Sequence, residues 1–180
     1  MESYRVDIGS ILDVLGESLE IADELSFEQF VVGTEAFAPR GQASFRVTLT
    51  NTGTAVIAMG SVEFPVTATC SRCLVEFPTD IAGEVNGFYV TPGHEDGVPE
   101  EQEIEYIDAE GFVDLYPAIL AALVLEAPFA PLHDEACRGI CAQCGADLNE
   151  GPCTCEDRHS ETHPFAALKD LLQTEPAEGE

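Results

Sequence analysis

The sequence has very little positive charge. Its 180 residues include 7 Lys and Arg against 34 Asp and Glu, which gives a formal net charge of −27 at pH 7. No Lys or Arg lies between Arg72 and Arg138. Direct binding to nucleic acid normally requires a basic patch, because Lys and Arg replace the counterions that leave the phosphates. Direct RNA binding is therefore doubtful, and the acidic surface favours either basic partner proteins or simple solubility.

Long apolar segments are also missing. The longest charge-free apolar run, Leu115 to Leu125, is shorter than the roughly 20 residues that span a bilayer. Near the N-terminus, Asp7 and Asp13 interrupt the apolar residues, so the core of a signal peptide is absent. We expect a soluble protein without a membrane partner, in the reducing cytoplasm, where disulfides are rare.

The sequence carries no familiar catalytic motif. It has no Gly-x-Ser-x-Gly, P-loop or His-Glu-x-x-His pattern. We therefore expect a protein that is not an enzyme. A metal-dependent hydrolase or nuclease that acts on precursor RNA is a less favoured alternative.

Cysteine, in contrast, is abundant, with seven residues. Two closely spaced pairs, Cys141/Cys144 and Cys153/Cys155, are joined by a short connection. Zinc binds four thiolates tetrahedrally at about 2.3 Å, and the glycine after Cys144 permits the backbone bend of a zinc knuckle. An all-thiolate set is typical of structural zinc, because catalytic zinc keeps an open position. The sequence predicts a closed Zn²⁺ site here.

The remaining cysteines suggest a second zinc site. Cys70-Ser-Arg-Cys73 follows a predicted strand, and Cys137 and His133 could supply the other two ligands. Two alternatives stay open for Cys70 and Cys73, a thiol redox switch and a pair of ordinary buried thiols. The ligand partition is open as well, because Cys137 could join the C-terminal knuckle in place of Cys153 or Cys155.

Hydrophobic periodicity predicts an α+β fold. Residues 10–25 have the spacing of an amphipathic helix, whereas residues 43–90 alternate with a period of two, as antiparallel strands do. Pro65 suggests an edge strand. We expect an antiparallel sheet or open, barrel-like β core with a buried helix, a C-terminal cysteine-rich zinc knuckle and a short helix.

The predicted domain organisation follows from these segments. Residues 1–132 form the core domain, with a helical N-terminal segment, strands in about 43–90, an acidic loop at 91–110 and a buried helix at about 114–126. Residues 133–173 form the zinc knuckle and a docking helix that begins near Pro164. Residues 174–180 form a disordered acidic tail.

Several motifs in this order resemble those of one protein family. They are Cys70-Ser-Arg-Cys73-Leu74, Asp114-Leu115 before the apolar helix, Pro131-Leu132, Cys137-Arg-Gly-Ile-Cys141-Ala-Gln-Cys144-Gly-Ala-Asp-Leu-Asn and His163-Pro-Phe-Ala-Ala-Leu-Lys-Asp-Leu-Leu172. Over roughly residues 60–173 the sequence resembles the YceD family, the large ribosomal RNA subunit accumulation proteins of bacteria. In the cysteine-rich branch a Cys commonly follows Pro-Leu, whereas this chain has His133, which zinc also accepts.

The resemblance implies a role in the accumulation or processing of large-subunit ribosomal RNA and in ribosome assembly, in the bacterial cytoplasm. Because the net charge of −27 disfavours direct binding to RNA, we expect the protein to act by binding another protein. The resulting hypothesis is a zinc-stabilised, non-enzymatic accessory factor that binds a basic ribosomal protein or a pre-ribosomal particle.

Overall fold

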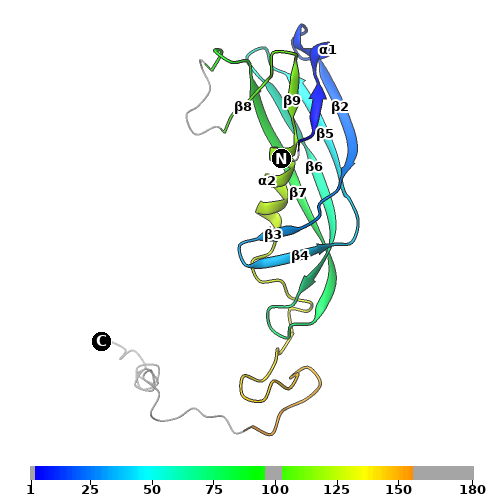
Figure 1. Cartoon of the computed structure of the whole chain (residues 1–180), viewed down its shortest axis with the longest axis vertical. Helices are drawn as coiled ribbons and strands as arrows, with labels where there is room; N and C mark the ends of the chain where they lie inside the picture. Colours follow the sequence, from blue (N-terminus) through cyan, green and yellow to red (C-terminus); the bar gives the residue numbers. More distant parts are fainter. Residues whose placement is uncertain (1–2, 96–102, 156–180) are drawn as a thin grey trace, which may run out of the picture. The chain divides into compact units, whose positions relative to one another are not determined.

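The computed structural model describes residues 3–95 and 103–155, and these residues form nine strands and two helices (Figure 1). The chain divides into two compact units, Met1–Cys137 and Arg138–Glu180. The division thus falls after Cys137 rather than after residue 132, so His133 belongs to the first unit. The predicted docking helix and the acidic tail lie outside the described residues.

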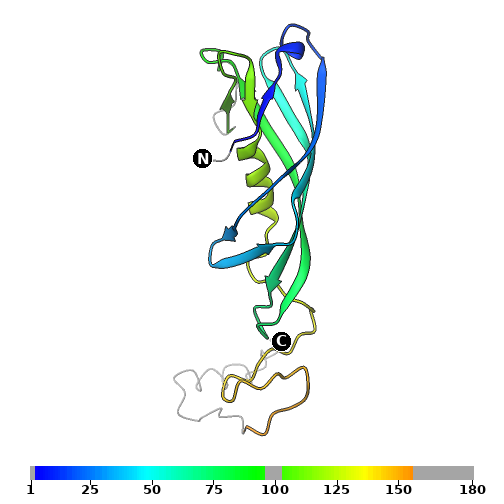
Figure 2. The same cartoon turned by 45° about the vertical axis from the view of Figure 1, so that its right-hand side comes forward.

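A large, mostly antiparallel sheet is the main element of the first unit. Strands β5 (Ala43–Asn51), β6 (Val56–Thr69) and β7 (Glu76–Val90) follow one another as a meander, and β2 (Ser18–Leu25) pairs with the other side of β5. Figure 2 shows the same strands from a second direction. The predicted antiparallel sheet is confirmed, and it is an open sheet rather than a closed barrel.

Short strands extend this sheet at both ends of β6 and β7. Strand β4 (Glu35–Pro39) pairs with β6 and with β3 (Phe30–Val32), while β8 (Glu105–Tyr106) runs parallel to the end of β7. A separate two-stranded sheet consists of β1 (Arg5–Asp7) and β9 (Phe112–Asp114).

The edge position suggested by Pro65 is wrong, because β6 lies between two neighbours. On one side of β6, pairing with β5 ends at Glu63 and pairing with β4 begins at Val66. Pro65 occupies the gap between these two partners, where a missing N–H costs no ladder hydrogen bond. A central strand therefore tolerates proline at this point.

The alternating pattern of the strands builds the core. Phe45, Val47 and Leu49 are buried, whereas Arg46 and Thr48 between them are exposed. Phe64 contacts the rings of Phe27 and Phe30 at centroid distances of 5.1 and 5.7 Å. Burial of each such side chain contributes about 2 kcal/mol to folding.

Helix α2 (Tyr116–Glu126) packs on β7 with one face only. Its buried residues are Ile119, Ala122 and Leu123, while Leu125 is 79% exposed. The close approach requires a glycine in the strand, because a Cβ at Gly83 would lie 2.5 Å from the carbonyl oxygen of Ala122. Neither helix among the described residues has the length and apolarity that a membrane crossing requires.

The predicted helix over residues 10–25 is wrong. Helix α1 spans only Gly9–Leu12, and β2 begins at Ser18. Gly16 separates them with a positive φ of 82°. Leu19, Ile21 and Leu25 alternate as in a strand, but Asp23 stands between Ile21 and Leu25 where the alternation predicts an apolar residue. Asp23 accepts a 2.6 Å hydrogen bond from the Tyr4 hydroxyl. The helical spacing of the apolar residues therefore misled the prediction.

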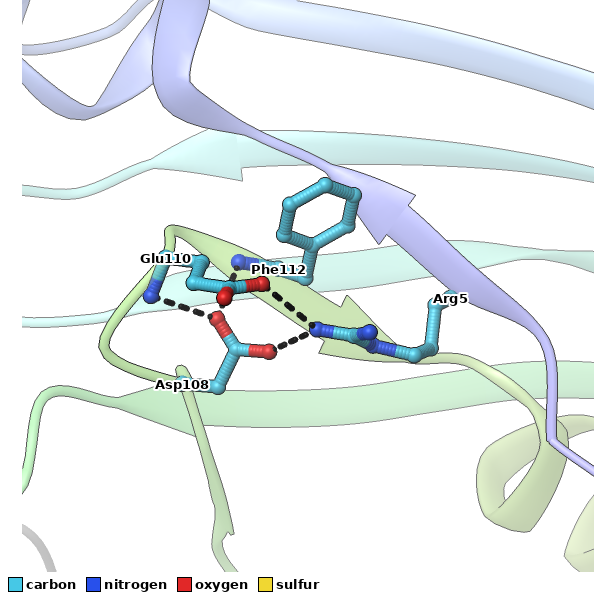
Figure 3. A network of polar contacts seen from close by, with 4 residues as sticks. All are labelled: Arg5, Asp108, Glu110 and Phe112. Carbon is cyan, nitrogen blue, oxygen red and sulfur yellow. Dashed lines mark hydrogen bonds and ion pairs between the residues drawn. The ribbon is translucent and has the colours of Figure 1, made fainter.

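A group of polar contacts on the surface joins Arg5 of β1 to Asp108 and Glu110, which precede β9 (Figure 3). The Arg5 guanidinium bonds the Asp108 carboxylate, lies 3.6 Å from Glu110 Oε2 and sits 4.6 Å above the ring of Phe112. Asp108 also accepts hydrogen bonds from the amides of Glu110 and Phe112. Arg5, one of the few basic residues, is thus ion-paired with carboxylates of its own chain.

Candidate metal centres

The first group of metal-ligating side chains combines the turn between β6 and β7 with the segment after α2. Ligand atoms of Cys70, Cys73, His133 and Cys137 all lie within 4.8 Å of one another. The Sγ atoms of Cys70 and Cys137 are 3.9 Å apart, and Cys73 Sγ is 3.4 Å from His133 Nδ1. Cys70 and Cys137 are buried, whereas His133 is exposed.

The Cys70–Cys73 turn has the backbone geometry of a knuckle. The amide of Cys70 donates to Val75 O and the amide of Leu74 donates to Cys70 O, both at 2.8 Å. The turn requires a left-handed residue after the second cysteine, and Leu74 adopts this conformation with φ of 63°. Leucine is strained there, since the left-handed region costs a residue with a Cβ about 1–2 kcal/mol.

Arg72 holds the two halves of this group together. Its Nη1 donates to the carbonyl oxygens of Glu135 at 2.9 Å and Cys137 at 2.8 Å. The amide of the neighbouring Ser71 donates to Pro131 O at 2.8 Å. Sequence reasoning missed this role of Arg72, because backbone carbonyls have no signature in the sequence.

The second group lies in the second unit. Ligand atoms of Cys141, Cys144, Cys153 and Cys155 are again all within 4.8 Å of one another. The turn repeats the pattern of the first group, because Cys141 N donates to Ala146 O at 2.8 Å and Gly145 N donates to Cys141 O at 2.9 Å. Gly145 takes the left-handed position with φ of 73°, without the strain of Leu74.

The thiols of each group differ in acidity. Burial raises the pKa of Cys70, but hydrogen bonds from the His133 side chain and from backbone amides outweigh it and lower that pKa to about 5. Although the Val75 backbone lowers the pKa of Cys73, burial and the thiols of Cys70 and Cys137 raise it to about 11. Backbone amides of Cys144 and Gln143 lower the pKa of Cys141 to about 6, and the Cys144 thiol and burial raise that of Cys155 to about 12. Each group therefore holds protons that a cation would displace.

Both groups have dimensions that suit a metal ion. Bonds of about 2.3 Å at tetrahedral angles place two thiolate sulfurs about 3.8 Å apart, close to the 3.9 Å between Cys70 and Cys137. The structure therefore gathers all eight predicted ligands into two groups of four that could hold a metal ion, and it places Cys137 with Cys70 rather than with the C-terminal cysteines.

Cys70 and Cys73 lie in a turn between antiparallel strands. A dithiol of the thioredoxin type begins a helix in a parallel βαβ unit, where the helix N-terminus lowers a thiol pKa. Here the two cysteines connect β6 with β7, which pair from Thr69 and Glu76 onward. This surrounding structure is that of a knuckle rather than of a redox helix.

Comparisons with known proteins agree on one family. A family model described as "Large ribosomal RNA subunit accumulation protein YceD" matches residues 58–172, a range that contains both groups of ligands. An uncharacterized protein of Mycobacterium leprae is 30% identical over 118 residues, which are 65% of this chain and 53% of that protein. Uncharacterized proteins of Mycobacterium bovis and Mycobacterium tuberculosis are 31% identical over 122 residues, 67% of this chain and 57% of each relative.

The matched segment spans little more than half the length of these curated relatives. No solved structure matches the chain.

Proposed function

The chain belongs to the YceD family, whose model is named for accumulation of the large ribosomal RNA subunit, and from this premise we propose a zinc-stabilised accessory factor. It takes part in the accumulation or processing of large-subunit ribosomal RNA and in ribosome assembly. It acts by binding a basic ribosomal protein or an assembling particle and contributes binding rather than catalysis.

The donor sets support zinc as the metal. Seven thiols and one imidazole make up the two groups, and soft thiolates with imidazole select zinc over magnesium or calcium. Each group supplies four ligands, which fill a tetrahedral ion and leave no position for a substrate. Zinc here would stabilise the fold, because binding free energy at a structural site is folding free energy.

The observation that carries the proposed mode of action is the imbalance of charge. Five of the seven basic residues lie in the described segments, and three of these are engaged internally. Arg5 bonds Asp108, Arg46 bonds Glu20 at 2.5 Å, and Arg72 bonds two carbonyls. Few cations are left to contact phosphates, whereas the acidic surface attracts basic proteins through long-range steering.

A depletion experiment tests the biological part of the proposal. Cells that lack the protein should accumulate less large-subunit than small-subunit ribosomal RNA, measured by quantitative hybridisation and by sucrose gradients. Re-expression of the wild-type chain should restore the ratio, and a Cys70→Ser, Cys73→Ser variant should not. An unchanged ratio of the two RNAs after depletion would contradict the proposal.

Purification of the tagged protein tests the partner. At low salt we expect a defined basic ribosomal protein to co-purify and at high salt to dissociate, because salt screens charge attraction between exposed surfaces. Ribonuclease treatment before purification is the control, since a partner held through RNA would be lost. Recovery of no basic ribosomal protein at either salt concentration counts against the proposed mode of action.

A further inference from the structure

The large sheet has an edge without a neighbouring strand among the described residues. Strand β2 pairs with β5 along all of Ser18–Leu25 and is the terminal strand in the sheet order. Figures 1 and 2 both show β2 at the border of the sheet. Such an edge presents backbone N–H and C=O groups that can pair with another strand.

The hydrogen bonds at the start of β2 show which residues face outward. Asn51 N donates to Glu17 O at 3.0 Å, so Ser18 and Thr50, which are register partners, form a non-hydrogen-bonded pair. Residues then alternate, and the outward amides belong to Ser18, Glu20, Ala22 and Glu24. In agreement with this alternation, Glu24 N donates at 2.8 Å to the Asp23 side chain and not to β5.

The edge is predominantly acidic, and the neighbouring cation, Arg46 of β5, is ion-paired with Glu20. Strand β2 contains Glu20, Asp23 and Glu24 and has no Lys, Arg or Pro. A groove of about 920 Å³ adjoins the edge and crosses the sheet as far as β7. Its lining includes one basic residue, Arg46, and these carboxylates: Asp23, Glu24, Glu63, Glu84 and Glu126. A positively charged occupant complements this surface.

We propose that the free edge of β2 accepts an extended, basic segment of a partner protein as an additional strand. Outward amides and carbonyls of Ser18, Glu20 and Ala22 would form the ladder. Lys or Arg opposite Glu24, and opposite Glu20, whose carboxylate it would share with Arg46, would select the segment. A second copy of this chain fits less well, because β2 beside β2 gathers three acids from each copy without a cation from either strand. This inference rests on the proposed function, since it names the segment through which a basic partner binds.

A peptide probe tests the edge directly. The probe is a fluorescein-labelled octapeptide, Thr-Lys-Val-Thr-Val-Lys-Val-Thr, whose lysines have the four-residue separation of Glu20 and Glu24. Its control is the same peptide with Glu in place of Lys. We expect the wild-type chain to bind the lysine peptide and not the glutamate peptide in fluorescence anisotropy, with weaker binding at high salt.

Two variants at one position separate the backbone from the side chain. Ala22→Pro removes an outward amide without breaking a bond to β5, and an edge strand tolerates proline at such a position. The substitution should weaken peptide binding on the order of tenfold. Ala22→Val keeps the amide and should bind as the wild type does. Glu24→Lys, which leaves every backbone group in place, should also weaken binding.

Amide hydrogen exchange supplies the second readout. The amides of Glu20 and Ala22 should exchange quickly in the free protein and slowly with bound peptide, while that of Ile21, bonded to β5, should exchange slowly in both. Equal peptide binding by Ala22→Pro and wild type overturns the inference. So does slow exchange of Glu20 and Ala22 in the free protein, which would show an edge already covered by the chain itself or by a second copy.

The outcome is distinguishable from that of the proposed function. If a basic ribosomal protein binds Ala22→Pro as tightly as wild type, strand addition is wrong while the proposed function stands. If the peptide results agree with strand addition but no basic ribosomal protein binds, the proposed function fails and the edge remains a binding site.

Discussion

Cys70 and Cys137 are separated by 67 positions in the sequence, and their Sγ atoms lie 3.9 Å apart. The contact joins the β6–β7 turn to the segment that follows α2, two parts of the chain with no strand pairing between them. A metal ion on these thiolates would therefore cross-link distant segments, as a structural zinc does.

Arg72→Ala should weaken metal binding at the first group only. The variant loses the donations to Glu135 O and Cys137 O, and loss of such contacts costs about 1–2 kcal/mol, or roughly tenfold in affinity. Competition with a chromophoric chelator would show one weakened and one unchanged site. Ser71→Ala is the matched control, because Ser71 contacts Pro131 through its amide. Equal weakening in both variants would contradict the positioning role of Arg72.

Opposite substitutions at equivalent turn positions should have opposite effects. Gly145→Leu places a Cβ at φ of 73° and should cost about 1–2 kcal/mol. Leu74→Gly relieves a similar strain, but glycine also gives the unfolded chain more conformational freedom, which offsets part of the gain. The net stabilisation should lie between zero and about 1 kcal/mol. Urea denaturation of the metal-loaded variants measures both. A strongly destabilised Leu74→Gly would mean that the side chain has an unrecognised packing role.

Asn51→Ala should destabilise the first unit by about 2 kcal/mol. The buried side chain donates to the carbonyls of Ile11, Leu12 and Val14 at 2.8, 2.9 and 3.2 Å and accepts from Gly53 N. Alanine leaves these groups without their partner beside the end of α1. Asn86→Ala, at an exposed position, should change the unfolding free energy by less than about 0.5 kcal/mol. Similar midpoints for the two variants in thermal melting would contradict this account of Asn51.

Metal binding should release protons and weaken in acid. Zinc binds cysteine as the thiolate. Without metal, Cys73 and Cys155 retain their protons at pH 7, because their pKa values are about 11 and 12. Zinc must displace these protons, so its affinity should rise with pH in the neutral range. As the pH falls through about 6 and 5, Cys141 and Cys70 also protonate, and binding weakens further. Calorimetry in buffers of different ionisation enthalpy measures the release, and a buffer-independent enthalpy would contradict it.

The sheet was predictable from sequence where one face of each strand is apolar. Phe45, Val47 and Leu49 alternate with polar residues and indicate their strand without tertiary information. Strand β2 was not predictable in this way, because the exposed Asp23 takes the place of an apolar residue in the alternation of Leu19, Ile21 and Leu25. Its carboxylate accepts a hydrogen bond from Tyr4, which is distant in the chain. Local periodicity cannot reveal a polar residue whose partner is supplied by the fold.

The grouping of the ligands was predictable to the extent that spacing determines it. Cys141 and Cys144 share one turn, and so do Cys70 and Cys73, which their short spacings indicate. The position of Cys137 depends on where the chain runs after α2, which the sequence leaves open. The hydrogen bonds from Arg72 to backbone carbonyls and the left-handed conformation of Leu74 depend on backbone geometry. Neither has a signature in residue type.

The zinc content of the purified chain tests the central claim most directly. Elemental analysis of protein purified without added metal should give about two zinc ions per chain, one for each group of four ligands. The Cys70→Ser, Cys73→Ser variant should retain about one. A chain that contains no zinc, and whose melting temperature is unchanged after prolonged exposure to EDTA, would contradict the account.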